Sequence, residues 1–289
     1  LSIRRQRQMC IRDSYLDYQA NFFKQCGQSR FSMLADNVKQ PFNEYLGLLL
    51  NFGIIGLLVL LLLMVIIIYC YRKNPSVEKQ IAFYSLSSIG IFSFFSYPFA
   101  YPFVWVVTFL SIFIITSEYI KPLFSNILIK KIACMFILTY SLFGSSKLFE
   151  RIQAELDWGK ASTLALCKSY NETLPTYERL EKMFVSNPYF LYNYAAVLQE
   201  MKQYTESLEV ALKCRQYWAD YDLELIIGEN YQQLNKPELA EKYYNSASMM
   251  CPSRFLPLYK LFHLYKTNGE KERSLAMAEA VISLSLIHI

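Results

Sequence analysis

One uncharged apolar stretch constrains the fold of this chain more than any other feature. From Tyr45 to Tyr71 the sequence holds no aspartate, glutamate, lysine or arginine. At 1.5 Å per residue, a helix of this length exceeds the hydrocarbon core of a bilayer, which is about 30 Å thick. We therefore predict a membrane-spanning helix that tilts or protrudes from the bilayer.

Three further apolar stretches are candidates for membrane spans. They cover residues 80–97, 101–116 and 132–148. With the first stretch they predict about four transmembrane helices within residues 44–149. As an alternative, the third and fourth stretches form a single re-entrant or interfacial element.

Charges in the connecting segments orient these helices. The segments between the first and second stretches and between the third and fourth are basic, whereas the YPFAYP turn between the second and third carries no charge. Cytoplasmic loops are enriched in lysine and arginine. Residues 15–43, the YPFAYP turn and everything after Phe149 are therefore expected on the outer face of the membrane. The basic residues are Arg72, Lys73, Lys79, Lys121, Lys130 and Lys131.

A helical repeat is visible in residues 187–282. The small residues Ser207, Ala240 and Ser274 recur at steps of 33 and 34, which is the period of the tetratricopeptide repeat, TPR. The predicted second helices of the three units are residues 204–214, 237–247 and 271–281. We thus predict an all-α fold, with polytopic transmembrane helices followed by a TPR-type α-solenoid. Residues 150–186 are a linker or a degenerate helix pair.

Stacked repeats of this kind form a curved surface that typically docks proteins or peptides. Five aromatic residues that we expect to be exposed either line this surface, contact glycan or pack between repeats: Tyr189, Tyr192, Tyr217, Trp218 and Tyr221. Cys214 and Cys251 fall on helix-packing positions. His263 lacks a cysteine or histidine partner at metal-ligand spacing, so neither a metal site nor a cofactor is predicted. A net charge of +5 without a basic helix or stripe argues against a nucleic-acid partner.

The two ends of the chain differ from the rest. Residues 1–14 show no helical or strand period, and no apolar signal-peptide core follows them. They resemble translated sequencing-adapter read-through, as do residues 283–289. We expect both ends to be artefacts that flank an internal fragment of a longer reading frame.

The junction before the first apolar stretch combines polar and glycine residues at fixed spacing. In residues 36–56, DNVKQPFNEYLGLLLNFGIIG, nine residues follow Asn43, and Gly53, two isoleucines and Gly56 come next. This spacing resembles the signature of the O-antigen ligase and O-antigen polymerase family of membrane proteins. Phe42 stands where that family has a histidine, and the only histidines of the chain are His263 and His288.

The resemblance implies a glycosyltransferase site at this junction, on the periplasmic face of a multi-pass protein of a bacterial inner membrane whose TPR domain is also periplasmic. The donor in the family is a polyprenyl-diphosphate-linked glycan, and the acceptor would be lipid A core, a growing polysaccharide or a protein. Asn43 would position donor or acceptor, while Glu44 or Asp36 would assist deprotonation in place of histidine. The substrate-binding residues would be Arg30, which would hold the diphosphate, together with Lys39 and Asn51.

A structural interpretation of the junction stands beside the catalytic one. Asn43 is also a good helix N-cap, Glu44 suits the positive end of a helix dipole, and Gly53 and Gly56 suit helix packing. On that interpretation the chain is a non-catalytic, membrane-anchored TPR scaffold for the assembly of envelope proteins. Membrane lipid is a partner in both cases.

Overall fold

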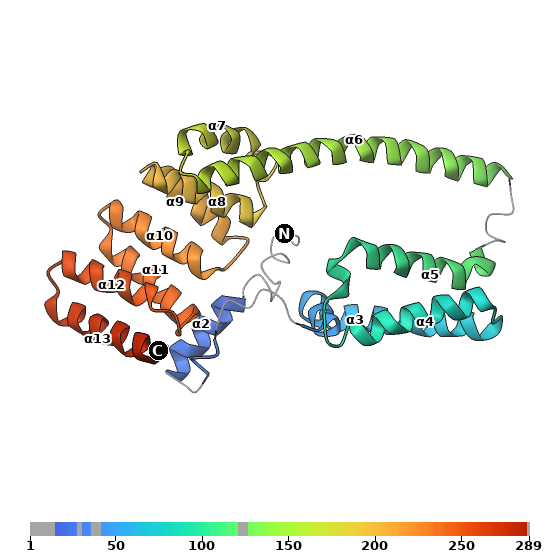
Figure 1. Ribbon diagram of the computed structural model, residues 1–289, viewed down its shortest axis with the longest axis horizontal. Coiled ribbons are helices and arrows are strands. Elements are labelled where there is room, and N and C mark those ends of the chain that lie inside the picture. The colour runs from blue at the N-terminus through green and yellow to red at the C-terminus, as the bar shows by residue number, and fades with distance from the viewer. Residues whose placement is uncertain (1–14, 28–30, 36–41, 121–126, 288–289) are drawn as a thin grey trace. The chain divides into compact units, whose positions relative to one another are not determined.

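The computed structural model describes residues 15–27, 31–35, 42–120 and 127–287. Regular structure in this part of the chain is entirely helical. The chain divides into two compact units, which are described separately. We call residues 38–148 the apolar unit; the other unit consists of residues 149–289, which we call the repeat unit, together with the N-terminal segment 1–37 (Figure 1).

The apolar unit has a small core in which α5 (Pro102–Ile120) packs against α4 (Val77–Phe92) and α3 (Glu44–Lys73). Cys70, Ala82 and Ile115 are buried at its centre. At the basic end of the unit, Lys79 pairs with Glu118 at 3.0 Å, and Asn74 Nδ2 donates to the same carboxylate at 2.9 Å. The elements are α3 (Glu44–Lys73), α4 (Val77–Phe92), the 3-10 helix η1 (Pro98–Ala100), α5 (Pro102–Ile120) and the first part of α6 (Ile127–Leu166).

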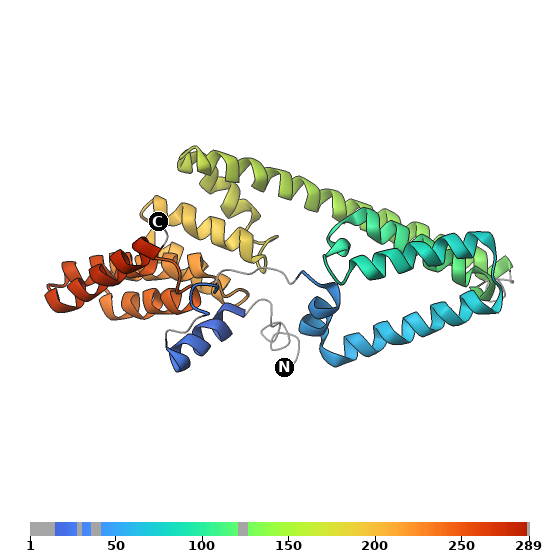
Figure 2. The same cartoon turned by 60° about the horizontal axis from the view of Figure 1, so that its bottom comes forward.

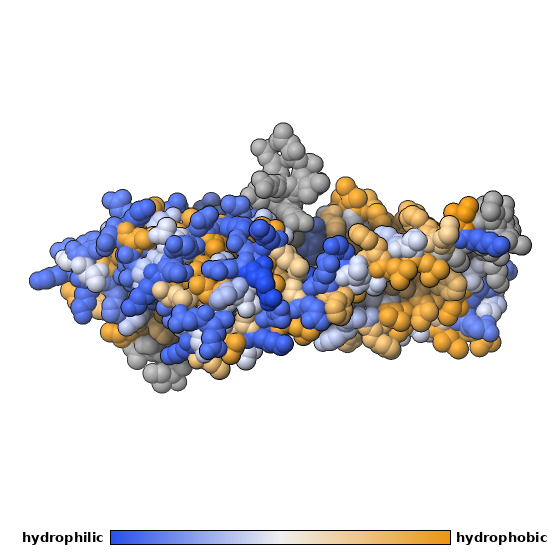
Figure 3. Space-filling model, turned by 90° about the horizontal axis from the view of Figure 1, so that it is seen from above, coloured by the Kyte–Doolittle hydropathy of each residue, from blue (hydrophilic) through white to orange (hydrophobic). Residues whose placement is uncertain are grey.

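Large apolar side chains cover the outside of the apolar unit. Ile55 is 72% exposed and Leu62 is 60% exposed, and Figure 3 shows hydrophobic residues gathered over this unit. An apolar surface of this extent marks a site that meets lipid or a partner. The repeat unit is covered mainly by hydrophilic residues in the same view.

Two of the expected spans have the length and composition to cross a membrane. They are α3 and residues 102–119 of α5. The second expected span corresponds to α4, which has 16 residues and is about 24 Å long. The fourth expected span lies within α6, a 40-residue helix that continues well beyond it. Among the described residues only these two helices meet the length and composition of a span, so the prediction of about four transmembrane helices in a polytopic domain is not supported.

The repeat unit contains the paired helices that the sequence period predicts. The pairs are α8 (Pro188–Glu200) with α9 (Tyr204–Arg215), α10 (Tyr221–Gln233) with α11 (Pro237–Met250), and α12 (Leu256–Thr267) with α13 (Lys271–Ile287). The prediction of TPR-like helix pairs is confirmed. Ser207 and Ala240 are fully buried and Ser274 is 9% exposed, because each lies where the two helices of a pair approach closely.

Close packing and buried hydrogen bonds join consecutive pairs. Ser207 Oγ donates to the carbonyl oxygen of Ala195 at 2.7 Å, and Asn230 Nδ2 donates to Ser207 Oγ at 2.7 Å. Ion pairs also connect successive units, with Lys213 on Glu181 at 2.9 Å and Lys260 on Glu229 at 2.8 Å. Partly exposed ion pairs contribute little, so buried packing carries the stability of the solenoid.

The segment before the first pair is helical as well. The second part of α6 and α7 (Tyr170–Leu180) bring Ala154, Ala161 and Tyr177 into one core with Phe190 of α8. The ring of Tyr177 lies 5.4 Å from that of Phe190. Residues 150–186, predicted as a linker or a degenerate helix pair, thus contribute helices to the core of the repeat unit.

The aromatic and cysteine residues singled out from the sequence have mostly packing roles. Tyr221 is buried, and the rings of Tyr189 and Tyr192 lie 5.2 and 6.1 Å from that of Trp218. Cys214 and Cys251 are both fully buried. Burial raises the pKa of the Cys214 thiol to about 12, which makes it unreactive at neutral pH. The ring of His263 packs on that of Tyr259 at 4.6 Å.

Candidate functional site

The structure gives Asn43 the role of a helix cap. Its side-chain Oδ1 accepts a hydrogen bond from the backbone N–H of Leu46 at 2.8 Å, which satisfies one of the unpaired donors at the start of α3. Its Nδ2 donates to the carbonyl oxygen of Phe94 at 3.1 Å. Asn43 therefore joins the start of α3 to the turn that follows α4.

Glu44 is bonded to the neighbouring turn. Its backbone N–H donates to the carbonyl oxygen of Ser93 at 2.9 Å, and its Oε1 accepts from the backbone N–H of Phe99 at 3.1 Å. The carboxylate thus holds η1 against the start of α3. Tyr45 adds a further link, because its hydroxyl donates to the carbonyl oxygen of Gly90 at 2.8 Å.

The glycines of the signature have backbone roles. Gly53 has φ of +66° inside α3, a conformation that other residues rarely adopt, and the helix is kinked there. A Cβ atom at Gly56 would lie 2.5 Å from Cβ of Phe52. The helix cap at Asn43 and the kink at Gly53 therefore give both signature residues a structural role that does not require a bound substrate.

The other residues predicted for the glycosyltransferase site are not brought together around Glu44 by any described contact. Arg30, Asp36 and Lys39 lie outside the described residues. Asn51 is exposed on α3, two turns beyond the cap. Phe42, which replaces the family histidine, places its ring 5.6 Å from that of Tyr97. Within the described part of the chain, no group of three His, Cys, Asp or Glu residues could hold a metal ion.

Sequence reasoning missed a second site, where α2 (Tyr15–Cys26) packs against α11 of the repeat unit (Figures 1 and 2). We call it the α2 anchor, and it consists of Leu16, Asp17, Gln19 and Phe23 of α2 with Arg215, Glu224 and Met250 of the repeat unit. Leu16, Gln19 and Phe23 form the buried face of α2. In the sequence, Tyr15–Tyr18 and Phe22–Phe23 alternate with polar positions, which predicts a short helix at the membrane interface beside the junction. In the structure the buried face of this helix packs on the repeat unit instead.

A partly buried charge cluster lies at the centre of the α2 anchor. The Nε of Arg215 donates to Glu224, whose side chain is 2% exposed, and both terminal nitrogens of Arg215 donate to the carboxylate of Asp17. Burial raises the pKa of Glu224, and Arg215 offsets only part of this effect. Burial alone would lower the pKa of Arg215, but Glu224 and Asp17 outweigh it and raise that pKa. Arg215 is therefore charged at every physiological pH.

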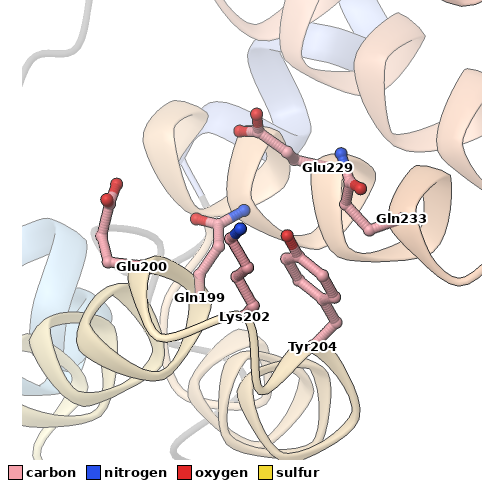
Figure 4. A pocket seen from close by; sticks show the side chains of 6 residues that line it. All are labelled: Gln199, Glu200, Lys202, Tyr204, Glu229 and Gln233. Carbon is pink, nitrogen blue, oxygen red and sulfur yellow. The ribbon is translucent and has the colours of Figure 1, made fainter.

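The repeat unit also has a polar pocket of about 210 Å³ at the ends of its helices (Figure 4). In this view the ends of Gln199, Lys202 and Tyr204 point toward α10, which supplies Glu229 and Gln233. The side-chain Nε2 of Gln199 is buried and has no hydrogen-bond partner among the described residues. A buried unpaired amide of this kind calls for an acceptor, such as a peptide carbonyl. The lining residues are Gln199, Glu200, Lys202, Tyr204, Glu229 and Gln233.

Comparison with known proteins finds likeness only in solved structures. No family model matches the chain, and no curated protein matches it. One similar structure is the MamA RS-1 ArsTM double mutant, with 18% sequence identity and a TM-score of 0.44; the match covers 47% of this chain and 76% of that chain. Another is MamA 41-end from Desulfovibrio magneticus RS-1, with 20% identity and a TM-score of 0.41; the match covers 47% of this chain and 75% of that chain. A third is YrrB, a TPR protein with an unusual peptide-binding site, with 19% identity and a TM-score of 0.40; the match covers 44% of this chain and 66% of that chain.

These neighbours are TPR-repeat proteins, and they cover about half of the chain. At such identities and TM-scores the likeness carries no argument about activity. The repeat assignment rests instead on the period of 33 and 34 residues and on the helix pairs. The resemblance to O-antigen ligases finds no support in any of these comparisons.

Proposed function

We propose that this protein is a membrane-anchored TPR scaffold that binds a protein partner through its repeat unit. The observation that carries the proposal is the α2 anchor, where the repeat unit binds a helix from the N-terminal segment through a partly buried arginine. The apolar unit supplies the membrane attachment, since its large apolar side chains face outward. The polar pocket at Gln199 offers a second contact for a peptide.

The α2 anchor also bears on membrane topology. α2 precedes α3, whereas the repeat unit follows the first part of α6, and the two are in contact. Segments in contact lie on one side of a membrane, so the chain between them crosses it an even number of times. An even number of crossings is obtained with α3 and α5 alone, the two helices long and apolar enough to span a membrane, and also with the four spans expected from the sequence. Together with the basic loops, it supports a multi-pass inner-membrane protein whose repeat unit is periplasmic.

Glycan transfer at the α3 junction is the second candidate function. It is favoured by one observation, the spacing of Asn43, Gly53 and Gly56 that resembles the O-antigen ligase signature. Under this proposal a polyprenyl-diphosphate-linked glycan is moved at the periplasmic face to lipid A core, a polysaccharide or a protein. We rank it second because Asn43 and Glu44 already bond the backbone of the neighbouring turn.

Photo-crosslinking in native membranes tests the scaffold proposal. A photoreactive amino acid replaces Gln233, which lines the polar pocket, or Glu238, an exposed residue on α11. We expect a discrete protein adduct from position 233 and none from position 238, because only the first faces the pocket. No adduct from position 233, or the same diffuse adducts from both positions, would contradict a partner bound at this surface.

A further inference from the structure

We propose that the groove occupied by α2 is a docking site for an acidic amphipathic helix of a partner protein, and that α2 is its intramolecular occupant. This inference rests on the proposed scaffold function and names the surface and the chemistry of the partner. The groove is the part of the α2 anchor contributed by the repeat unit, and its polar groups are the side chains of Arg215 and Glu224 and the backbone carbonyl oxygen of Met250.

Arg215 is arranged to recognise a carboxylate. Glu224, which is almost fully buried, bonds the Nε of Arg215 and so fixes the plane of the guanidinium. The two terminal nitrogens then point at the occupant, where the two oxygens of Asp17 accept from them. Paired contacts of this kind add both energy and geometric selectivity. An acidic residue in the first turn of the bound helix is therefore the main recognition feature.

The remaining contacts define the rest of the motif. Leu16 is 3% exposed and belongs to one apolar cluster with Tyr221 and Tyr244 of the repeat unit. The side-chain amide of Gln19 donates to the carbonyl oxygen of Met250, the last residue of α11, where helix carbonyls lack intrahelical partners. A matching partner helix has an apolar residue before the acid, an amide two positions after it, and an aromatic residue at the place of Phe23.

The occupant can leave without disrupting the receptor. α2 has 12 residues, and an isolated helix of that length is marginal in water, so it owes its helical form to the groove. When α2 leaves, Glu224 keeps its bond to Arg215, and the buried carboxylate is not left unpaired. The groove is thus complete in the absence of α2, which is the property that a docking site for an exchangeable helix requires.

Peptide binding to the full chain in detergent micelles tests this inference. The probe is a fluorescent peptide with the sequence of residues 15–26, and the receptor is either the wild type or the double variant Leu16→Asp/Phe23→Asp, in which α2 is released. We expect the released variant to bind the peptide at least about tenfold more tightly than the wild type, where α2 competes. Asp17→Asn in the peptide weakens binding about tenfold, since charge-assisted hydrogen bonds are lost.

A peptide carrying Tyr18→Gln is the matched control, because Tyr18 is 61% exposed on α2; it binds like the parent peptide. Equal binding of the parent and Asp17→Asn peptides overturns the inference. So does a released variant that keeps its helical content but binds nothing. A protein adduct at position 233 together with no peptide binding would be consistent with the scaffold proposal but would show that the groove is not its docking site.

Hydrogen exchange on the wild-type chain provides a second measurement that does not depend on the folding of the variant. We expect the amides of α2 to exchange faster than those of α10 and α11, because α2 opens while the paired helices stay closed. Added peptide without a fluorophore accelerates exchange in α2 alone. If the amides of α2 exchange at the same rate as those of α10 and α11, α2 does not open separately and the groove is not available to a partner helix.

Discussion

Replacement of Arg215 by methionine is expected to lower the free energy of unfolding of the repeat unit by about 3 kcal/mol, because a buried carboxylate loses its only cation in the cluster. The side chain of Glu224 is 2% exposed, so solvent compensates little for the loss of the guanidinium. Chemical denaturation of the full chain in detergent, followed by circular dichroism, measures the change.

The double variant Arg215→Met/Glu224→Leu is the decisive control for this prediction. It removes both charges, and we expect it to recover most of the lost stability, as replacement of a buried pair by apolar residues often does. Asp17→Asn should cost much less, since Asp17 is 36% exposed and its pairing is screened by solvent. If Arg215→Met unfolds like the wild type, Arg215 does not stabilise the cluster as described.

Gly228→Ala is expected to destabilise the repeat unit by about 2 kcal/mol through overpacking. A Cβ atom at position 228 would lie 2.6 and 2.7 Å from two ring carbons of Tyr244. The ring cannot move aside easily, because Tyr244 is fully buried and its hydroxyl donates to Gln232 at 3.0 Å. The melting temperature of the repeat unit, followed by tyrosine and tryptophan fluorescence, reports the effect.

Gly159→Ala is the matched control on α6. Nothing lies within 4 Å of the Cβ atom that this change adds, so the higher helix propensity of alanine should stabilise the chain by up to about 1 kcal/mol. Opposite signs for the two substitutions would establish that packing against Tyr244 decides the outcome. A Gly228→Ala chain as stable as the wild type would show that α10 and α11 are less closely packed than described.

The repeat unit could be predicted because its sequence signals report local packing. Ser207, Ala240 and Ser274 recur at the repeat period, since each must be small where two helices of a pair meet. The residues around these three positions align at the same spacing, so the bounds of the paired helices can be estimated from it. Helix pairing within 34 residues depends on few long-range contacts, and the period alone is sufficient to identify it.

The junction at Asn43 was harder to interpret from sequence. An asparagine before an apolar helix has the same appearance whether it caps the helix or positions a substrate. Likewise, a glycine at position 53 gives no sign that its φ is +66°. Only the contacts to Leu46 and Phe99 distinguish these roles, and they depend on how α3, α4 and η1 pack.

The α2 anchor could not be predicted because it joins residues far apart in the chain. Asp17 and Arg215 are separated by 198 positions. The residues around each of them give no indication that the two side chains are in contact. The one available signal was the spacing of Leu16, Gln19 and Phe23, which is typical of a helix with one buried face. That spacing predicts a buried face but not the surface that covers it.

Complementation of a gene deletion in the host tests the central claim most directly. The deleted strain receives the wild-type gene, a gene with Asn43→Ala and Glu44→Gln, or a gene with Gly228→Ala, and its envelope glycans and proteins are compared on gels at matched protein levels. A scaffold predicts that Asn43→Ala/Glu44→Gln restores the wild-type pattern, whereas Gly228→Ala does not. Loss of lipopolysaccharide capping, polysaccharide length or protein glycosylation in the Asn43→Ala/Glu44→Gln strain, with the repeat unit intact, would contradict the scaffold and assign the chemistry to the α3 junction.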